Sequence, residues 1–230
     1  MSYQIQRGDN LYEIAKKHNI SVDSILDNNP GINPQNLLVG SYIYLPIVED
    51  HFMIDNKLHE RMRQVWEQHV FWTRLLIVSI MERLGDEDAT TKRLLRNADD
   101  LADIYRPYYG SDVASTIAKL ITEHLVIAAK LVHAIVDNNT TEIDTLNTAW
   151  YQNADDIAVA FSSINPHYDK ELLRSMLHTH LDLTKEEVIN RFQKDHVKEI
   201  ETFDRVEQEI IMMADYLTRG ILKQFYQREQ

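Results

Sequence analysis

The order of hydrophobic and polar residues divides the chain into two regions with different periods. Residues 3–46 hold two short alternating stretches, 3–6 and 42–45, on either side of two short helical patterns. From residue 56 onward, apolar residues recur at every third or fourth position, which is the period of amphipathic helices. The pattern therefore predicts a small strand–helix–helix–strand region followed by an all-helical region.

Cap and turn residues support this assignment in the first region. Asn10 is placed to cap the first short helix, because its side chain can accept a hydrogen bond from the first helical turn. The second helix is predicted to end before Pro30, which disfavours helical geometry at Asn29, while Gly31 permits a left-handed turn. Pro46 ends the second strand.

These residues also carry a resemblance to a known family. The matching motifs follow one another along nearly the whole segment: Tyr3-x-Ile5-x-x-Gly8-Asp9-Asn10-Leu11, then Asn29-Pro30-Gly31-Ile32-Asn33-Pro34, then Leu38-Val39-Gly40-x-Tyr42-Ile43-Tyr44-Leu45-Pro46. The segment resembles a complete LysM module. The resemblance implies a βααβ fold that binds glycans containing N-acetylglucosamine, in a shallow groove between the loop before the first helix and the loop after the second.

The resemblance assigns residues to both sides of this groove. They are Gly8, Asp9, Asn10 and Leu11 on one side, and Asn29, Pro30, Gly31 and Ile32 on the other. Exposed backbone groups in bent loops suit the acetamido groups of the sugars, and Leu11 and Ile32 are expected to offer apolar contact to sugar faces. Asn10 stands where the family commonly has threonine. The alternative is that these residues only build the turns.

The second region is predicted to contain six helical segments, at about residues 56–83, 88–106, 111–137, 141–164, 168–183 and 185–227. Thr184 followed by Glu187 has the form of a capping box, so the sixth segment is expected to open there. The connections are short, and Gly110 marks one of them. Short connections make neighbouring helices antiparallel, which predicts an up-and-down bundle.

The predicted fold class is therefore a small α+β domain followed by an all-α helical bundle. We expect the LysM module at residues 1–47, an irregular linker at 48–55 and the bundle at 56–230.

Four apolar stripes of the bundle each contain one polar residue inside the stripe rather than at its margin. These residues are His69, His124, Asn153 and His180, with Glu123 and Asp156 beside them in the sequence. If the side chains converge, they form a site for a metal or small ligand, with histidine nitrogens as ligands and carboxylates as further ligands or orienters. The simpler interpretation, which we favour at this point, is a structural polar network that selects one helix register.

Composition excludes several classes of function. The net charge is −12, and an acidic surface repels phosphate groups, so nucleic acid and membranes are poor partners. The chain has no cysteine, which excludes disulfides, thiolate zinc sites and cysteine nucleophiles. The first residues lack the apolar run of a secretory signal, so we expect synthesis in the cytoplasm, and no run is long enough to cross a membrane. The paired carboxylates across a cleft that a glycoside hydrolase needs are not evident.

The helical region resembles a family of small helical proteins from spore-forming Gram-positive bacteria, through motifs such as Trp66-Glu67-Gln68-His69, Glu123-His124-Leu125 and Trp150-Tyr151-x-Asn153. The resemblance implies a bundle and a bacterial setting, without an activity. We expect a non-catalytic protein that binds peptidoglycan or a related glycan and targets the bundle to the cell wall or to the spore cortex or coat. Spore proteins are expected partners, and oligomers would add avidity. The alternative function is a bundle that binds a metal or small ligand, with or without catalysis, localised by the module; no other cofactor is expected.

Overall fold

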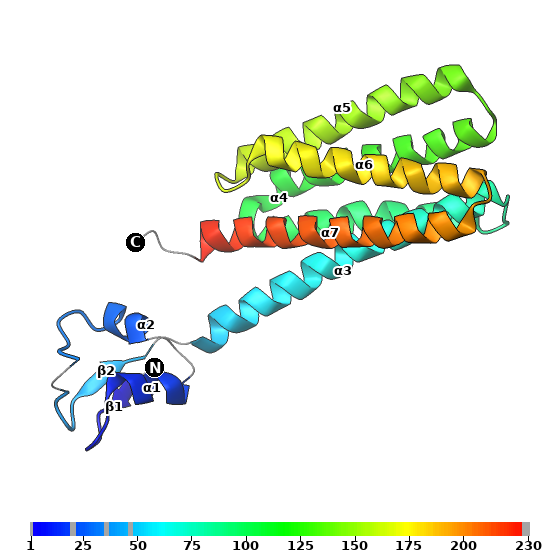
Figure 1. Cartoon of the computed structure of the whole chain (residues 1–230). Coiled ribbons are helices and arrows are strands. Elements are labelled where there is room, and N and C mark those ends of the chain that lie inside the picture. The colour runs from blue at the N-terminus through cyan, green and yellow to red at the C-terminus, as the bar shows by residue number, and fades with distance from the viewer. Residues whose placement is uncertain (1, 19–21, 35–36, 46–47, 227–230) are drawn as a thin grey trace. The chain divides into compact units, whose positions relative to one another are not determined.

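The computed structural model describes residues 2–18, 22–34, 37–45 and 48–226 (Figure 1). The chain divides into two compact units, Met1–Asn56 and Lys57–Gln230. Each unit has its own hydrophobic core.

The N-terminal unit has the predicted βααβ order. Strands β1 (Ser2–Gln4) and β2 (Tyr42–Tyr44) pair antiparallel, with Tyr3 opposite Ile43. Helices α1 (Leu11–His18) and α2 (Val22–Asp27) lie between them in the chain. The buried side chains come from both helices, both strand regions and their flanks: Ile5, Leu11, Ile14, Ala15, Ile25, Ile43 and Leu45. The periodic apolar positions of the sequence thus form this core.

The irregular linker predicted for residues 48–55 is wrong in its secondary structure. Helix α3 begins at Val48 and continues to Met81. Residues 48–55 contain neither proline nor glycine, so nothing in this segment interrupts the ladder of backbone hydrogen bonds.

The bundle contains α3 from Lys57 onward and four further helical elements. These are α4 (Glu87–Val136), α5 (Thr140–Ile164), α6 (Lys170–Phe192) and α7 (His196–Phe225). Helix α4 is interrupted at Gly110, whose φ of 82° and ψ of 177° are not helical. Glu87 and His133, 46 residues apart, lie with Oε1 and Nε2 only 3.0 Å apart.

An unbroken helix would separate those two residues by about 69 Å, so α4 turns back on itself at Gly110. Within the described residues, the helical region therefore runs through six segments in an up-and-down bundle, as the sequence predicted (Figure 1). Glycine suits this reversal because its positive φ carries no steric penalty.

The predicted start of the last helix at Thr184 is wrong. Thr184 lies within α6 and its hydroxyl donates a hydrogen bond of 2.9 Å to the His180 carbonyl, one turn earlier. The break between α6 and α7 falls at residues 193–195, where Lys194 has a φ of 62°. The side chain of Asp195 caps α7 by accepting a hydrogen bond from the Lys198 amide. A threonine inside a helix can satisfy its hydroxyl on the preceding turn, so a capping-box pattern alone does not mark a boundary.

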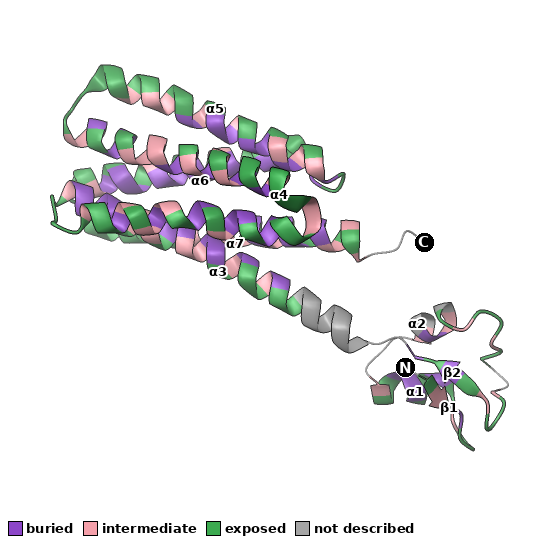
Figure 2. Cartoon of the chain, turned by 180° about the vertical axis from the view of Figure 1, so that it is seen from behind, coloured by how far each residue is buried: buried purple, intermediate pink, exposed green. Residues whose placement is uncertain are grey.

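The faces that the bundle helices turn toward one another are buried (Figure 2). Leu101, Leu125, Ile157, Leu181 and Ile210 are among the most completely buried side chains, and they come from α4, α5, α6 and α7. The same faces also bury polar side chains, including His69, His124 and His180. Within the described residues, no helix combines the length and apolar character needed to cross a bilayer.

Candidate functional site

An open hollow of about 610 Å³ lies on the surface of the N-terminal module. Residues 28–33 form one wall, and the rest of the lining comes from Ile5 and from residues within 37–44. Tyr42 and Tyr44 are 65% and 66% exposed, while Ile43 between them is buried. Alternate residues of a strand share a face, so both tyrosines stand on the same side of β2. The hollow therefore offers aromatic surface beside exposed loop backbone.

Four predicted groove residues, Asn29, Pro30, Gly31 and Ile32, line this hollow. The Asn29 side chain is used within the module: its amide donates to the carbonyls of Ile25 and Tyr44, and its oxygen accepts from the Tyr44 amide, each at 2.7 Å. Asn29 thus ties the end of α2 to β2 and fixes the shape of the wall. Gly31 has a φ of 94°, which bends the exposed loop.

The other predicted side, Gly8 to Leu11, does not line the hollow. The Asp9 carboxylate accepts hydrogen bonds from the Gln6 amide at 2.7 Å and the Tyr3 hydroxyl at 2.9 Å. The bond from the Gln6 backbone holds the pKa of Asp9 below its usual value despite some desolvation. Asn10 caps α1, as predicted, by accepting from the Glu13 amide at 2.9 Å.

The expectation that Leu11 offers its side chain to a sugar is wrong. Leu11 is only 3% exposed and belongs to the module core, because it occupies the inward face of α1.

In the bundle, three predicted histidines do come together. His69 of α3, His124 of α4 and His180 of α6 are all buried, and one nitrogen of each lies within 4.8 Å of the others. The rings of His124 and His180 lie 6.3 Å and 5.9 Å from the His69 ring, measured between centroids. We call these three residues the histidine cluster.

Two asparagines fix the orientation of this cluster. Asn97 accepts from His69 Nδ1 at 2.9 Å and donates to the Val65 carbonyl at 2.8 Å. Asn153 is the fourth predicted polar residue. It accepts a hydrogen bond from His124 Nδ1 at 2.8 Å and donates one to the Leu120 carbonyl at 3.1 Å.

Because each asparagine nitrogen donates to a carbonyl, its oxygen must be the acceptor, and each histidine carries its proton on Nδ1. The two Nε2 atoms therefore carry lone pairs. Burial, with the neighbouring histidines, lowers the pKa of His69 to about 3, and burial likewise lowers the pKa of His124 to about 3. Both rings are neutral at ordinary pH.

Two predicted carboxylates do not belong to the cluster. Glu123 and Asp156 are exposed, and they contact Lys119 and Gln152, respectively, on the same helices. Glu123 lies about 100° from His124 around its helix, and Asp156 lies about 60° from Asn153. Both side chains face solvent.

The structure adds three groups that the sequence interpretation missed: Asn97, Trp150 and Glu209. Trp150 donates to His124 Nε2 at 3.1 Å, and Glu209 of α7 places a carboxylate oxygen 3.3 Å from His180 Nδ1. Asn97 and Glu209 each lie three residues after a buried apolar residue of their own helix, Leu94 and Val206. Asn97 and Glu209 are therefore also polar residues inside apolar stripes, which is the pattern that identified His69.

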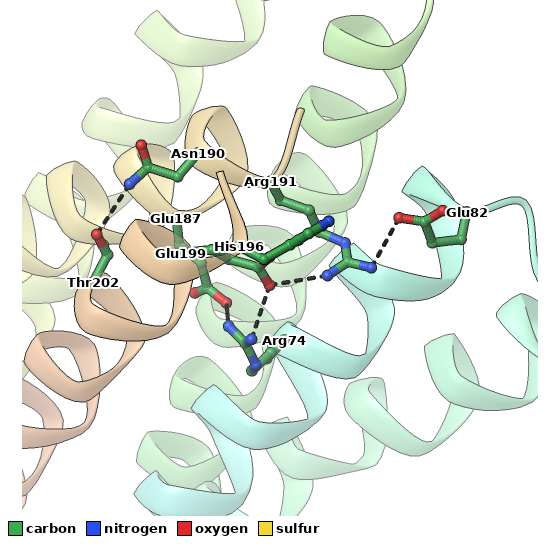
Figure 3. A network of polar contacts seen from close by, with 8 residues as sticks. All are labelled: Arg74, Glu82, Glu187, Asn190, Arg191, His196, Glu199 and Thr202. Atoms are coloured by element: carbon green, nitrogen blue, oxygen red, sulfur yellow. Dashed lines mark hydrogen bonds and ion pairs between the residues drawn. The ribbon is translucent and has the colours of Figure 1, made fainter. Parts of the chain in front are cut away.

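A second buried polar group lies among α3, α6 and α7 (Figure 3). Arg74 contacts Glu187 at 2.5 Å and Glu199 at 2.8 Å, and Arg191 contacts the same Glu199 oxygen at 2.9 Å. We call these four residues the charged cluster. Arg191 also reaches Glu82 at 2.9 Å.

The charges of this cluster are paired within it. Burial raises the pKa of Glu187 to about 7, against the opposing effect of Arg74. Burial acts in the same direction on Glu199, but hydrogen bonds from His196 and Arg191 outweigh it and hold its pKa below the usual value. Since cations and carboxylates neutralise each other here, the arrangement joins three helices and calls for no further ligand.

Comparisons with known proteins identify the N-terminal module alone. Residues 3–46 match the family model of the LysM domain, which supports binding of peptidoglycan or other N-acetylglucosamine glycans by this segment and association with the cell wall. No curated protein and no solved structure shows a significant match to the chain.

Proposed function

We propose that this protein is a non-catalytic glycan-binding protein whose LysM module holds peptidoglycan or a related polymer and thereby brings the helical bundle to the wall. The open hollow of the module, with Tyr42 and Tyr44 exposed beside the bent loop at Pro30 and Gly31, is the observation that carries the proposal. Aromatic faces suit the apolar faces of sugar rings, and exposed loop amides and carbonyls suit acetamido groups.

The glycan is placed along Asn29, Pro30, Gly31 and Ile32. Asn29 acts through the shape that its hydrogen bonds give the loop. Gly8 and Asn10, which are exposed, are candidates for contact with a further sugar unit through the loop before α1. Glycoside hydrolysis uses two carboxyl groups about the scissile bond, and no described residue that lines the hollow carries one. This supports binding without cleavage.

Co-sedimentation of the full chain with insoluble peptidoglycan tests the proposal. Tyr42→Ala together with Tyr44→Ala should weaken retention at least about tenfold, or about 1.4 kcal/mol. Tyr12→Ala is the matched control, because Tyr12 is also 65% exposed but lies on α1 outside the hollow. Wild-type protein that stays in the supernatant would refute glycan binding; a double variant retained as well as wild type would refute the hollow as its site.

The spore cortex or coat is the location that we favour within the wall, with spore proteins as partners of the bundle. The support is the resemblance of the helical region to proteins of spore formers, together with the LysM match. A fluorescent fusion expressed in a sporulating Gram-positive host should gather at the forespore. A fusion that stays diffuse throughout sporulation would contradict this location and leave glycan binding itself untouched.

A further inference from the structure

The histidine cluster brings three imidazoles from separate helical segments to one point inside the bundle. Because their ligand atoms lie within 4.8 Å of one another, a central point lies no more than about 2.8 Å from each. Zinc–histidine distances are about 2.0–2.1 Å, so each ring needs to move by only about 0.7 Å to coordinate one ion. We propose that His69, His124 and His180 bind a single first-row transition-metal dication, independently of the glycan site.

The tautomers of His69 and His124 are those that coordination requires. Asn97 and Asn153 each accept a hydrogen bond from the Nδ1–H of a histidine, which leaves the lone pair on Nε2. His180 turns Nδ1 toward Glu209, so its Nε2 is the nitrogen available to the cluster. A histidine that donates from its other nitrogen to an amide oxygen or carboxylate is the usual outer arrangement of a protein metal site.

Glu209 gives an independent reason for a cation at this place. The residue is 5% exposed, and neither carboxylate oxygen accepts a hydrogen bond from a described residue. Its 3.3 Å approach to His180 Nδ1 lacks hydrogen-bond geometry in the structure. A buried carboxylate is costly unless a cation or donors compensate it. A dication on Nε2 of His180 would place positive charge on the ring that faces Glu209.

The donor set selects the kind of ion. Three neutral imidazole nitrogens suit Zn²⁺, Co²⁺, Ni²⁺, Cu²⁺ or Fe²⁺, whereas Mg²⁺ and Ca²⁺ take oxygen ligands. Three protein ligands leave at least one coordination position for water or another small ligand.

Trp150 competes with a metal ion for His124 Nε2. Its indole N–H donates to His124 Nε2 at 3.1 Å, and that nitrogen has a single lone pair. An ion that takes the lone pair must displace the indole. The Trp150 hydrogen bond and metal coordination are therefore mutually exclusive, which separates a metal site from a purely structural network.

Titration of the chelator-treated full chain with Co²⁺ and with Zn²⁺ tests the proposal. We expect one bound ion per chain and a change in tryptophan fluorescence. Bound Co²⁺ should give the visible absorption of an ion with a low coordination number, and Zn²⁺ should abolish that absorption. Wild-type protein that is folded by circular dichroism and takes up neither ion stoichiometrically would overturn the proposal.

Substitutions assign the ligands. His69→Ala, His124→Ala and His180→Ala should each abolish the Co²⁺ spectrum, while His178→Ala should not, because His178 lies on α6 and bonds Asp155 outside the cluster. Loss of the spectrum counts only for variants that keep the helical circular dichroism of the wild type. A folded His124→Ala chain that binds Co²⁺ like the wild type would contradict the assignment.

Trp150→Phe gives a test that does not depend on removing a ligand. The change keeps an aromatic ring but removes the competing donor, so affinity for Zn²⁺ should rise by up to about tenfold. A structural network would respond only in stability. Unchanged or weaker Zn²⁺ affinity in a folded Trp150→Phe chain would contradict the proposed coordination by His124.

Discussion

The two units hold their polar groups in opposite surroundings. In the N-terminal module, Tyr42, Tyr44 and the Pro30–Gly31 loop stand exposed around an open hollow. In the bundle, the histidine cluster and the charged cluster are buried between helices. Exposed groups can bind a large ligand without any change in the fold, whereas the contacts of buried polar groups form only when the bundle folds. We therefore expect stability and glycan retention to respond to different substitutions.

Arg74→Ala should have the largest effect on stability. The change leaves the buried carboxylates of Glu187 and Glu199 with one cation fewer, and breaking a buried ion pair costs about 3–5 kcal/mol. Urea unfolding followed by circular dichroism measures this loss. Glycan retention by the folded fraction should stay unchanged.

Arg205→Ala is the matched control for this prediction. Arg205 also pairs with a glutamate, Glu186 at 2.9 Å, but both side chains are about half exposed. Its loss should cost no more than about 1 kcal/mol. Equal losses for Arg74→Ala and Arg205→Ala would show that burial of the charged cluster contributes nothing to stability.

Acidification should have the next largest effect. His69 and His124 have a pKa of about 3 in the folded chain against 6.5 for a free histidine. Between these values the unfolded chain holds a proton on each ring that the folded chain does not hold. Stability is therefore lost as the pH falls below 6.5, by about 1.4 kcal/mol per pH unit for each histidine.

Glu187 acts in the opposite direction over much of this range. Its pKa is raised from 4.5 to about 7, so the folded chain holds a proton that the unfolded chain releases, and stability is lost as the pH rises between these values. Glu187→Gln removes this opposing effect and should steepen the loss on acidification. Urea midpoints of chelator-treated protein between about pH 5 and pH 7 measure both profiles. Urea midpoints that do not change with pH, in both the wild type and Glu187→Gln, would contradict the assigned protonation states.

Removal of a helix cap should have the smallest effect, and it compares the two units directly. Asn10 caps α1 of the module, and Asn139 caps α5 of the bundle through the Glu142 amide. Asn→Ala at either cap should cost about 1 kcal/mol. Amide hydrogen exchange should report the loss only within the unit that carries the substitution. Loss of protection in both units from either change would contradict their independence.

The sequence predicted the module in more detail than the bundle. The βααβ order, the Asn10 cap and the bend at Gly31 depend on residues close together in the chain, so local rules identify them. The six-segment bundle also followed from periodicity. The start of the last helix did not, because Thr184 satisfies its hydroxyl within α6 and the break depends on the backbone of Lys194.

The site residues of the bundle were only partly predictable for a physical reason. A polar residue inside an apolar stripe must face the interior, which identified His69, His124, Asn153 and His180. Their partners depend on how neighbouring helices are aligned, and neither periodicity nor spacing gives that alignment. The prediction of Glu123 and Asp156 as members of the cluster is therefore wrong, and Asn97 of α4 and Glu209 of α7 supply contacts to His69 and His180.

The charged cluster was missed because arginine and glutamate usually mark an exposed helix face. Arg74 of α3 faces α6 and α7, where its pairing with two glutamates compensates its burial. A single sequence gives no sign of such a pairing across more than one hundred residues.

We propose that glycan binds in the hollow of the module and nowhere on the bundle. Amide chemical-shift mapping of the full chain during titration with a soluble N-acetylglucosamine oligomer distinguishes the two places. We expect shifts that saturate and that concentrate at residues 28–33 and 41–44, with the amides of α4 to α7 unchanged. Saturating shifts in the bundle, or no shifts at the hollow, would contradict it.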